Sequence, residues 1–167
     1  MNERKSNPSA ATTPNELTIT RILNAPRALV YKVFTEIEHA LKWGGPRDYP
    51  MAHLEGELRV GGKWRGCLRA KDGGEEMWQG GVYREIMPNE RLVYTFAWDE
   101  ESGNSPLETL ITLTFSDTDD GKTKMTFHQA PFASAESRDG HREGWNSAFD
   151  RLDDYLKTDP VTGSKQK

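Results

Sequence analysis

The side chains that could perform acid–base or metal chemistry are few and scattered. The four histidines, His39, His53, His128 and His141, show none of the short spacings that bring two imidazoles to one metal ion. Cys67 is the single cysteine, so the chain cannot form an internal disulfide. No Ser–His–Asp order, paired carboxylate at a telling spacing or phosphate-binding loop is present. We therefore expect neither a metal nor a cofactor.

Two polar residues are nevertheless candidates for contact with a ligand. His141 opens the last amphipathic segment, and as a general acid or base it would need a partner and exclusion of water. Gln129 lies at the end of a strand, at a position whose side chain alternation directs to the inner face of the sheet. A buried amide there must find hydrogen bonds from protein, water or a ligand. If a ligand binds, we expect Gln129, Tyr83 and His141 to orient it. The alternative is that Gln129 bonds to protein or water and that His141 packs at a helix end.

One long segment near the C-terminus must position these groups. Residues 140–156 carry Trp145, Phe149, Leu152 and Leu156 at the spacing of four and three that is typical of an amphipathic helix. The preceding chain has mostly strand character, and a single helix that follows many strands must bury its apolar face against a sheet. The space between that helix and the sheet is therefore where we look for function.

The earlier elements follow from alternation and turn signals. Residues 16–23 alternate as a strand, residues 25–37 carry an apolar helical face, and residues 39–43 form a second short turn. Strand-like runs separated by turns follow from 51 to 130. The clearest of these runs are 90–98, 107–115 and 122–129. The order predicts an α+β fold with a curved antiparallel sheet of about seven strands and one or two short helices after the first strand.

Alternation also assigns the two faces of the sheet. Phe96 and Trp98 share one face of their strand, whereas Thr95 falls on the opposite, solvated face. In the next two runs, Leu107 and Met125 are placed on the inner face. One apolar face and one wet face are typical of an antiparallel sheet that a single helix covers.

Composition places limits on the class of protein. The 167 residues suit one domain, and the net charge of −4 with scattered basic residues indicates no nucleic-acid partner. No apolar run has the length of a membrane span or the pattern of a signal peptide, so we expect no membrane partner. With one cysteine, a cytoplasmic location is the expectation. We predict disordered tails at 1–15 and 159–167 around a domain at 16–158, as a monomer or homodimer.

Small residues on the last helix indicate a cavity. Gly140, Gly144 and Ala148 are spaced by four, and glycine within a helix costs about 1 kcal/mol relative to alanine. Either another element crosses closely there, or the missing side chains leave room for a ligand. For the second case the sheet aromatics would line an apolar chamber, although ordinary core packing also explains them. The predicted lining residues are Trp43, Trp64, Tyr83, Tyr94, Phe96, Trp98, Ile111, Met125, Phe127, Gln129, His141, Gly144, Trp145 and Ala148.

Several short motifs, in the right order, resemble those of a known superfamily. The motifs are Asn24-Ala25-Pro26, Trp43-Gly44-Gly45-Pro46, Arg59-Val60-Gly61-Gly62, the run Gly81, Tyr83, Glu85, Ile86, Pro88, Arg91 and Leu92, and His141 with Gly144 and Trp145. Over residues 16–157 the chain resembles the START-like, polyketide-cyclase-like (SRPBCC) superfamily, and most closely its branch of activator of heat-shock protein 90 ATPase homologues. The resemblance implies a helix-grip fold, in which the sheet wraps around the C-terminal helix.

The resemblance leaves three function classes open, because one fold carries many activities. The leading hypothesis is a protein that binds a hydrophobic small molecule in an apolar cavity between sheet and helix. The first alternative is a cyclase-type or hydratase-type enzyme that uses the same cavity. The second is an interaction module that regulates a chaperone ATPase, with the chaperone as partner. A packed interior would favour the interaction module, and an apolar cavity with a few polar groups would favour binding or catalysis.

Overall fold

The computed structural model describes residues 15–99 and 107–160. The predicted tails, residues 1–15 and 159–167, fall almost wholly outside these residues. Ten elements follow one another along the described chain: β2 (Leu17–Leu23), α1 (Arg27–Thr35), α2 (Ile37–Trp43), β3 (Met51–Gly56), β4 (Lys63–Arg69), β5 (Glu76–Met87), β6 (Arg91–Trp98), β7 (Thr109–Asp117), β8 (Thr123–Ala130) and α3 (Ala135–Leu156).

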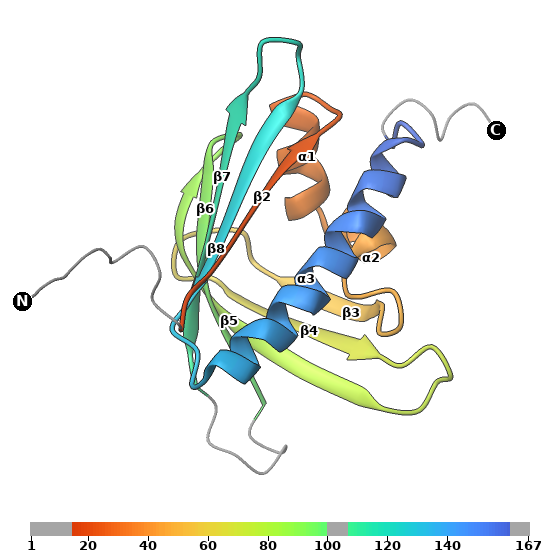
Figure 1. Cartoon of the computed structure of the whole chain (residues 1–167), viewed down its shortest axis with the longest axis vertical. Helices are drawn as coiled ribbons and strands as arrows, with labels where there is room; N and C mark the ends of the chain where they lie inside the picture. The colour runs from red at the N-terminus through yellow and green to blue at the C-terminus, as the bar shows by residue number, and fades with distance from the viewer. Residues whose placement is uncertain (1–14, 100–106, 161–167) are drawn as a thin grey trace, which may run out of the picture.

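The strands form one antiparallel sheet that curves around the long C-terminal helix. Its seven strands lie in the order β2-β8-β7-β6-β5-β4-β3, so that the first strand closes onto the last. Figure 1 shows the sheet bending around α3, with α1 and α2 beside the C-terminal half of that helix. The predicted α+β helix-grip fold is therefore confirmed. Among the described residues, no helix is both long enough and apolar enough to cross a bilayer.

The apolar face of α3 and the inner face of the sheet form the core. Phe149 and Leu152 of α3 are fully buried, as are Met125 and Phe127 of β8. The Phe149 and Phe127 rings meet edge to face, with centroids 5.5 Å apart. Full burial of a side chain of this size contributes about 1.5–3 kcal/mol, so these contacts hold the helix against the sheet.

A polar residue on the inner face of β2 also attaches α3 to the sheet. The Arg21 guanidinium lies 2.9 Å from a carboxylate oxygen of Asp150 and 3.2 Å from one of Asp153. It also donates to the backbone carbonyl of Asn146. Arg21 interrupts the apolar alternation of its strand because its side chain binds the polar flank of the helix.

The region predicted as one helix from 25 to 37 contains a break. Glu36 has extended backbone angles, φ −87° and ψ 125°, and separates α1 from α2. The break lets α2 fold back, so that the Trp43 indole N–H donates to the Val33 carbonyl over 3.0 Å. The Trp43 and Phe34 rings also meet, with centroids 4.8 Å apart. These contacts hold the two short helices together, as the prediction of a helix followed by a second short turn allowed.

Two assignments to the faces of the sheet were wrong. Thr95 is 2% exposed, because its hydroxyl accepts from the Val82 N–H and its carbonyl accepts from the Trp64 indole. These bonds satisfy a polar residue that alternation alone places in water. Leu107 is 48% exposed, because it precedes β7 and Thr109 takes the inward position.

The helix α3 begins earlier than predicted, at Ala135. The Ser134 hydroxyl accepts a hydrogen bond from the Ser137 N–H over 3.1 Å, which caps the first turn. The extra residues place Ser137 on the helix and put Gly140 well inside it. This N-terminal part of α3 covers the region in which the structure leaves space.

Candidate functional site

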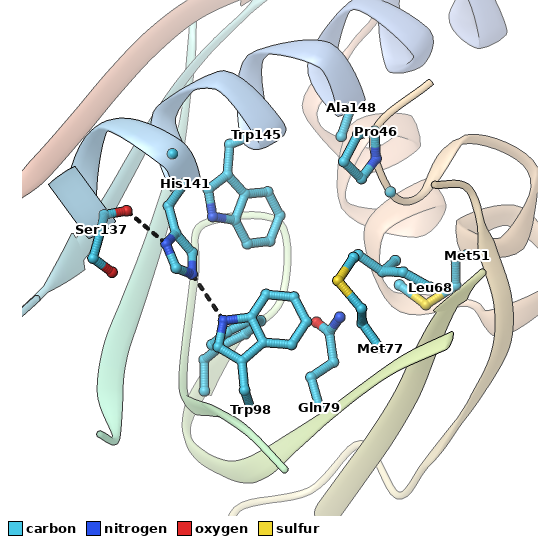
Figure 2. A pocket seen from close by; sticks show the side chains of 14 residues that line it. Pro46, Met51, Leu68, Met77, Gln79, Trp98, Ser137, His141, Trp145 and Ala148 are labelled. Atoms are coloured by element: carbon cyan, nitrogen blue, oxygen red, sulfur yellow. Dashed lines mark hydrogen bonds between the residues drawn. The ribbon is translucent and has the colours of Figure 1, made fainter. Parts of the chain in front are cut away.

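A cavity of about 400 Å³ lies between the N-terminal half of α3 and the strands β3 to β6. Figure 2 shows it between the helix and the sheet. Its lining is formed by Gly45, Pro46, Met51, Leu68, Met77, Gln79, Phe96, Trp98, Ser137, Gly140, His141, Gly144, Trp145 and Ala148. The wall is therefore apolar and sulfur-rich, with a few polar groups among carbon atoms.

The small residues of α3 provide part of this space. A Cβ built on Gly140 would have no heavy atom within 4 Å, so no other element crosses closely at that point. A Cβ on Gly144 would lie 3.6 Å from Pro46 Cγ, which is an ordinary contact. Gly140 is itself exposed, so its missing side chain leaves room at the solvent-accessible part of the cavity lining, whereas Gly144 faces the loop after α2.

That loop is held in place by Arg151 of α3. The Arg151 guanidinium donates to the carbonyl oxygens of Lys42, Gly44 and Gly45 at the C-terminal end of α2. Gly45 has φ +79°, a conformation that glycine adopts without steric cost. The turn directs Pro46 into the cavity wall, so the wall depends on hydrogen bonds between α3 and the loop.

His141 is engaged through both ring nitrogens. Its Nδ1 lies 2.9 Å from the Ser137 carbonyl, and its Nε2 lies 3.0 Å from the Trp98 indole nitrogen, as Figure 2 shows. A carbonyl can only accept and an indole N–H can only donate, so Nδ1 carries the proton and Nε2 accepts. Burial lowers the pKa of His141, and the weaker effect of the Ser137 hydrogen bond opposes it. His141 is thus a neutral residue that holds the Trp98 ring in the wall.

Gln129 acts in a similar way on Trp145. It is fully buried, its Oε1 accepts from the Trp145 indole N–H over 2.9 Å, and its Nε2 donates to the Thr109 hydroxyl over 2.9 Å. The Thr109 hydroxyl donates in turn to the Phe96 carbonyl over 3.1 Å. Gln129 therefore lies behind the cavity wall, with protein as its partner. Tyr83, the third residue expected to orient a ligand, also lies outside the lining.

The structure divides the predicted lining residues into two groups. Those that line the cavity are Phe96, Trp98, His141, Gly144, Trp145 and Ala148. Those that lie elsewhere in or against the core are Trp43, Trp64, Tyr83, Tyr94, Ile111, Met125, Phe127 and Gln129. For the residues of β7 and β8 the cause is the filling of the space over these strands: the Phe127 ring has its centroid 4.7 Å from Trp145 and 5.5 Å from Phe149. The cavity lies toward β3–β6.

Several lining residues are absent from the predicted lining, and half of them come from β3, β4 and β5. Met77 and Gln79 pair with Leu68 and Gly66 across the β4–β5 ladder. The register of that ladder would therefore have identified them. The sequence of β5 lacks a clear alternation, so its inner face was not assigned. The additional lining residues are Gly45, Pro46, Met51, Leu68, Met77, Gln79, Ser137 and Gly140.

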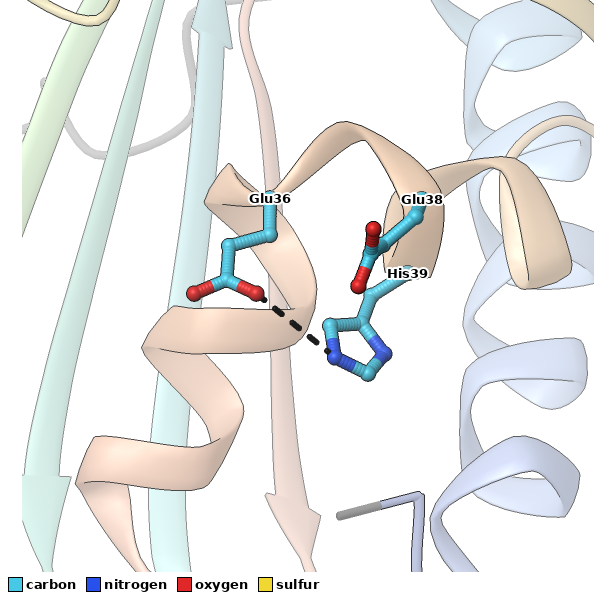
Figure 3. Close-up of side chains that lie close together, drawn as sticks. All are labelled: Glu36, Glu38 and His39. Carbon is cyan, nitrogen blue, oxygen red and sulfur yellow. Dashed lines mark ion pairs between the residues drawn. The ribbon is translucent and has the colours of Figure 1, made fainter. Parts of the chain in front are cut away.

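A second cluster, away from the cavity, could be mistaken for a metal site. Glu36, Glu38 and His39 gather at the junction of α1 and α2 (Figure 3), with one possible ligand atom from each within 4.8 Å of the others. Lys32 already pairs with Glu36 over 2.9 Å, and the Tyr155 hydroxyl lies 2.7 Å from His39 Nδ1. The two carboxylates are exposed. We interpret the cluster as a surface ion-pair network.

Comparison with known proteins agrees with this architecture. The family described as "Activator of Hsp90 ATPase homolog 1-like protein" matches residues 24–157, which is most of the chain and includes the cavity and α3. The chain belongs to this family. The resemblance seen in its motifs is confirmed at the level of family and fold. A search of curated proteins gives no match.

Solved structures of other proteins show the same fold. A protein from Chromobacterium violaceum is similar over 84% of this chain and 96% of its own, with 28% identity and a TM-score of 0.77. A protein from Rhizobium leguminosarum is similar over 85% of this chain and 93% of its own, with 26% identity and a TM-score of 0.68. An AHSA1 protein from Silicibacter pomeroyi is similar over 86% of this chain and 99% of its own, with 17% identity and a TM-score of 0.75. At this identity the similarity concerns the fold alone.

Proposed function

We propose that this member of the family binds a hydrophobic small molecule in the cavity beneath α3. The observation that carries the proposal is the cavity itself, about 400 Å³ with an apolar wall. Small-molecule sites typically have about 300–1,000 Å³ and a mostly apolar lining with a few polar groups. Gly140 supports the same function, because a glycine that costs helix stability keeps the space open.

The geometry favours binding over catalysis. A cyclase-type or hydratase-type reaction in this cavity would need a group that takes or gives a proton. Both ring nitrogens of His141 are already bonded to protein, and its protonation would place a proton on Nε2 against the Trp98 N–H. Among the described residues, the cavity lining includes no carboxylate, lysine or cysteine side chain. Binding requires none of these groups.

The chaperone-regulating alternative rests on the family description and predicts a packed interior with an exposed apolar patch. The cavity beneath α3 favours the small-molecule proposal by the same criterion. A chaperone activity would have to be carried by another surface of the molecule.

The test is a substitution that fills the cavity. Gly140→Leu would place a branched side chain in the empty space beneath α3, where a Cβ meets no atom within 4 Å. Glu143→Leu adds the same leucine at an exposed position of the same helix and serves as the control. The probe is N-phenyl-1-naphthylamine, an uncharged dye whose fluorescence rises in apolar sites.

We expect the wild type and Glu143→Leu to bind the dye with similar affinity. For Gly140→Leu we expect Kd to rise about tenfold or more, which is a loss of ~1.4 kcal/mol or more. Circular dichroism would check that all three proteins keep their fold. Equal binding by all three would place the dye outside the cavity, and failure of the wild type to bind would contradict the proposal directly.

A further inference from the structure

Gln79 lines the cavity, and its side-chain nitrogen has no hydrogen-bond partner among the residues that the structure describes. It lies on β5, between Gly66 of β4 and Trp98 of β6 in the ladder. Its side chain is 4% exposed, and its Nε2 atom has no partner among the described residues. Figure 2 shows the carboxamide beside Trp98 and Met77, directed toward the space beneath α3. Buried polar side chains in proteins nearly always have a partner, so this atom requires an explanation.

The surrounding protein does not offer Nε2 an acceptor. The Trp98 indole N–H is itself a donor and is bonded to His141 Nε2. The Ser137 carbonyl accepts from His141 Nδ1. The sulfur of Met77 is a weak acceptor, and no bond to it forms. A molecule inside the cavity, either a ligand or a bound water, can supply the missing acceptor.

The cavity also restricts the charge of that molecule. Among the described lining residues, none has a side chain that is charged at neutral pH, since His141 holds a single proton between its two partners. A carboxylate or ammonium group that enters such a wall loses its hydration without an opposite charge to replace it. An uncharged acceptor, such as a ketone, ester or amide carbonyl, loses far less.

We infer that the ligand is an uncharged, mostly apolar molecule with a carbonyl-type hydrogen-bond acceptor, and that Gln79 Nε2 donates to that acceptor. The inference rests on the proposed function, because it names the class of ligand for the same cavity. Gln79 fixes the orientation of the molecule, with its polar end at the sheet and its apolar body toward Trp145 and the open space below Gly140.

Three probes of nearly the same shape separate the acceptor from the apolar body. They are 2-acetylnaphthalene, which carries a ketone, 2-isopropenylnaphthalene, in which a CH₂ group replaces the ketone oxygen, and 2-naphthoate, which carries a carboxylate. Isothermal titration calorimetry would compare their Kd values on the full chain. The variant Gln79→Met keeps a similar volume and removes both N–H donors. Lys124→Met adds the same methionine at an exposed position of β8 as a control.

We expect the wild type and Lys124→Met to bind the ketone about tenfold more tightly than the hydrocarbon, and the carboxylate more weakly than the ketone by a similar factor. In Gln79→Met the ratio of ketone to hydrocarbon should fall to about one. The Gln79 side-chain amide resonances of the wild type should shift with the ketone and not with the hydrocarbon. Because the substitution removes an unsatisfied buried donor, the melting temperature of Gln79→Met should equal or exceed that of the wild type.

The outcomes distinguish a wrong role for Gln79 from a wrong proposed function. If both uncharged probes bind equally and Gln79→Met changes neither, the cavity binds apolar molecules and the role of Gln79 is overturned. If the carboxylate binds most tightly, the assignment of an uncharged ligand is overturned. If none of the three binds the wild type, the proposed function itself fails.

Discussion

The substitution Gly140→Ala tests whether the surface of α3 at Gly140, which lines the cavity, is free of other protein atoms. Gly140 is interior to the helix Ala135–Leu156, beyond its first turn, and a Cβ there would meet no heavy atom within 4 Å. Alanine therefore adds helix propensity without a steric cost, and the gain is about 0.8–1 kcal/mol in the free energy of unfolding. For a chain of this size, 1 kcal/mol shifts the melting temperature by about 2–4 °C.

Gly121→Ala is the matched control for this prediction. A Cβ at Gly121 would also meet no atom within 4 Å, but its φ of +84° lies in the left-handed region. Alanine in that conformation costs about 1–2 kcal/mol, so this variant should lose stability. Urea unfolding monitored by circular dichroism would give both values. A loss of stability in Gly140→Ala would show that the site beneath the helix is occupied by protein, and the reasoning about the cavity would then be wrong.

Two further predictions concern the polar residues that hold the cavity wall. The pKa of His141 lies below its ordinary value of 6.5. As the pH falls below about 6.5, the unfolded chain therefore binds a proton at this residue and the native protein does not. The free energy of unfolding falls as a result. Urea unfolding at about pH 7.5 and about pH 5.5 should show a smaller loss in His141→Gln than in the wild type, and equal losses would contradict the neutral assignment. Gln129→Leu should lower the free energy of unfolding by about 1–3 kcal/mol, because it leaves the buried Trp145 N–H without its acceptor. Guanidinium unfolding would measure this change, and a loss well under that range would mean that Trp145 finds another partner.

Periodicity was a sound guide to the elements of the fold. Met125 and Phe127 were placed on the inner face by alternation, and both are buried. Phe149 and Leu152 were placed on the apolar stripe of the last helix, and both are fully buried. Side-chain direction in a strand or helix follows from local geometry, so a local pattern is enough to predict it. The exact position of the break at Glu36, one residue before the predicted end of the first helix, depends on contacts that α2 makes with α1 after folding back.

The position of the cavity could not be predicted in the same way. Alternation indicated that Met125 and Phe96 face the helix, and both do, yet only Phe96 lines the cavity. The difference depends on how far Trp145 and Phe149 extend from α3 over β8, which is a matter of packing. Gln79 was missed for a related reason, since its inward direction comes from its register with Gly66 on β4.

The sequence by itself determined the class of fold, the family and the amphipathic helix that the sheet encloses. These depend on patterns between residues that are close in the chain. Only the tertiary structure decided that the empty space lies over β3–β6, that His141 and Gln129 are engaged by Trp98 and Trp145, and that Gln79 is left with a free donor. Each of these depends on which side chains from distant segments pack into the same region. Because protein interiors are close-packed, a region that one side chain fills has no room for another.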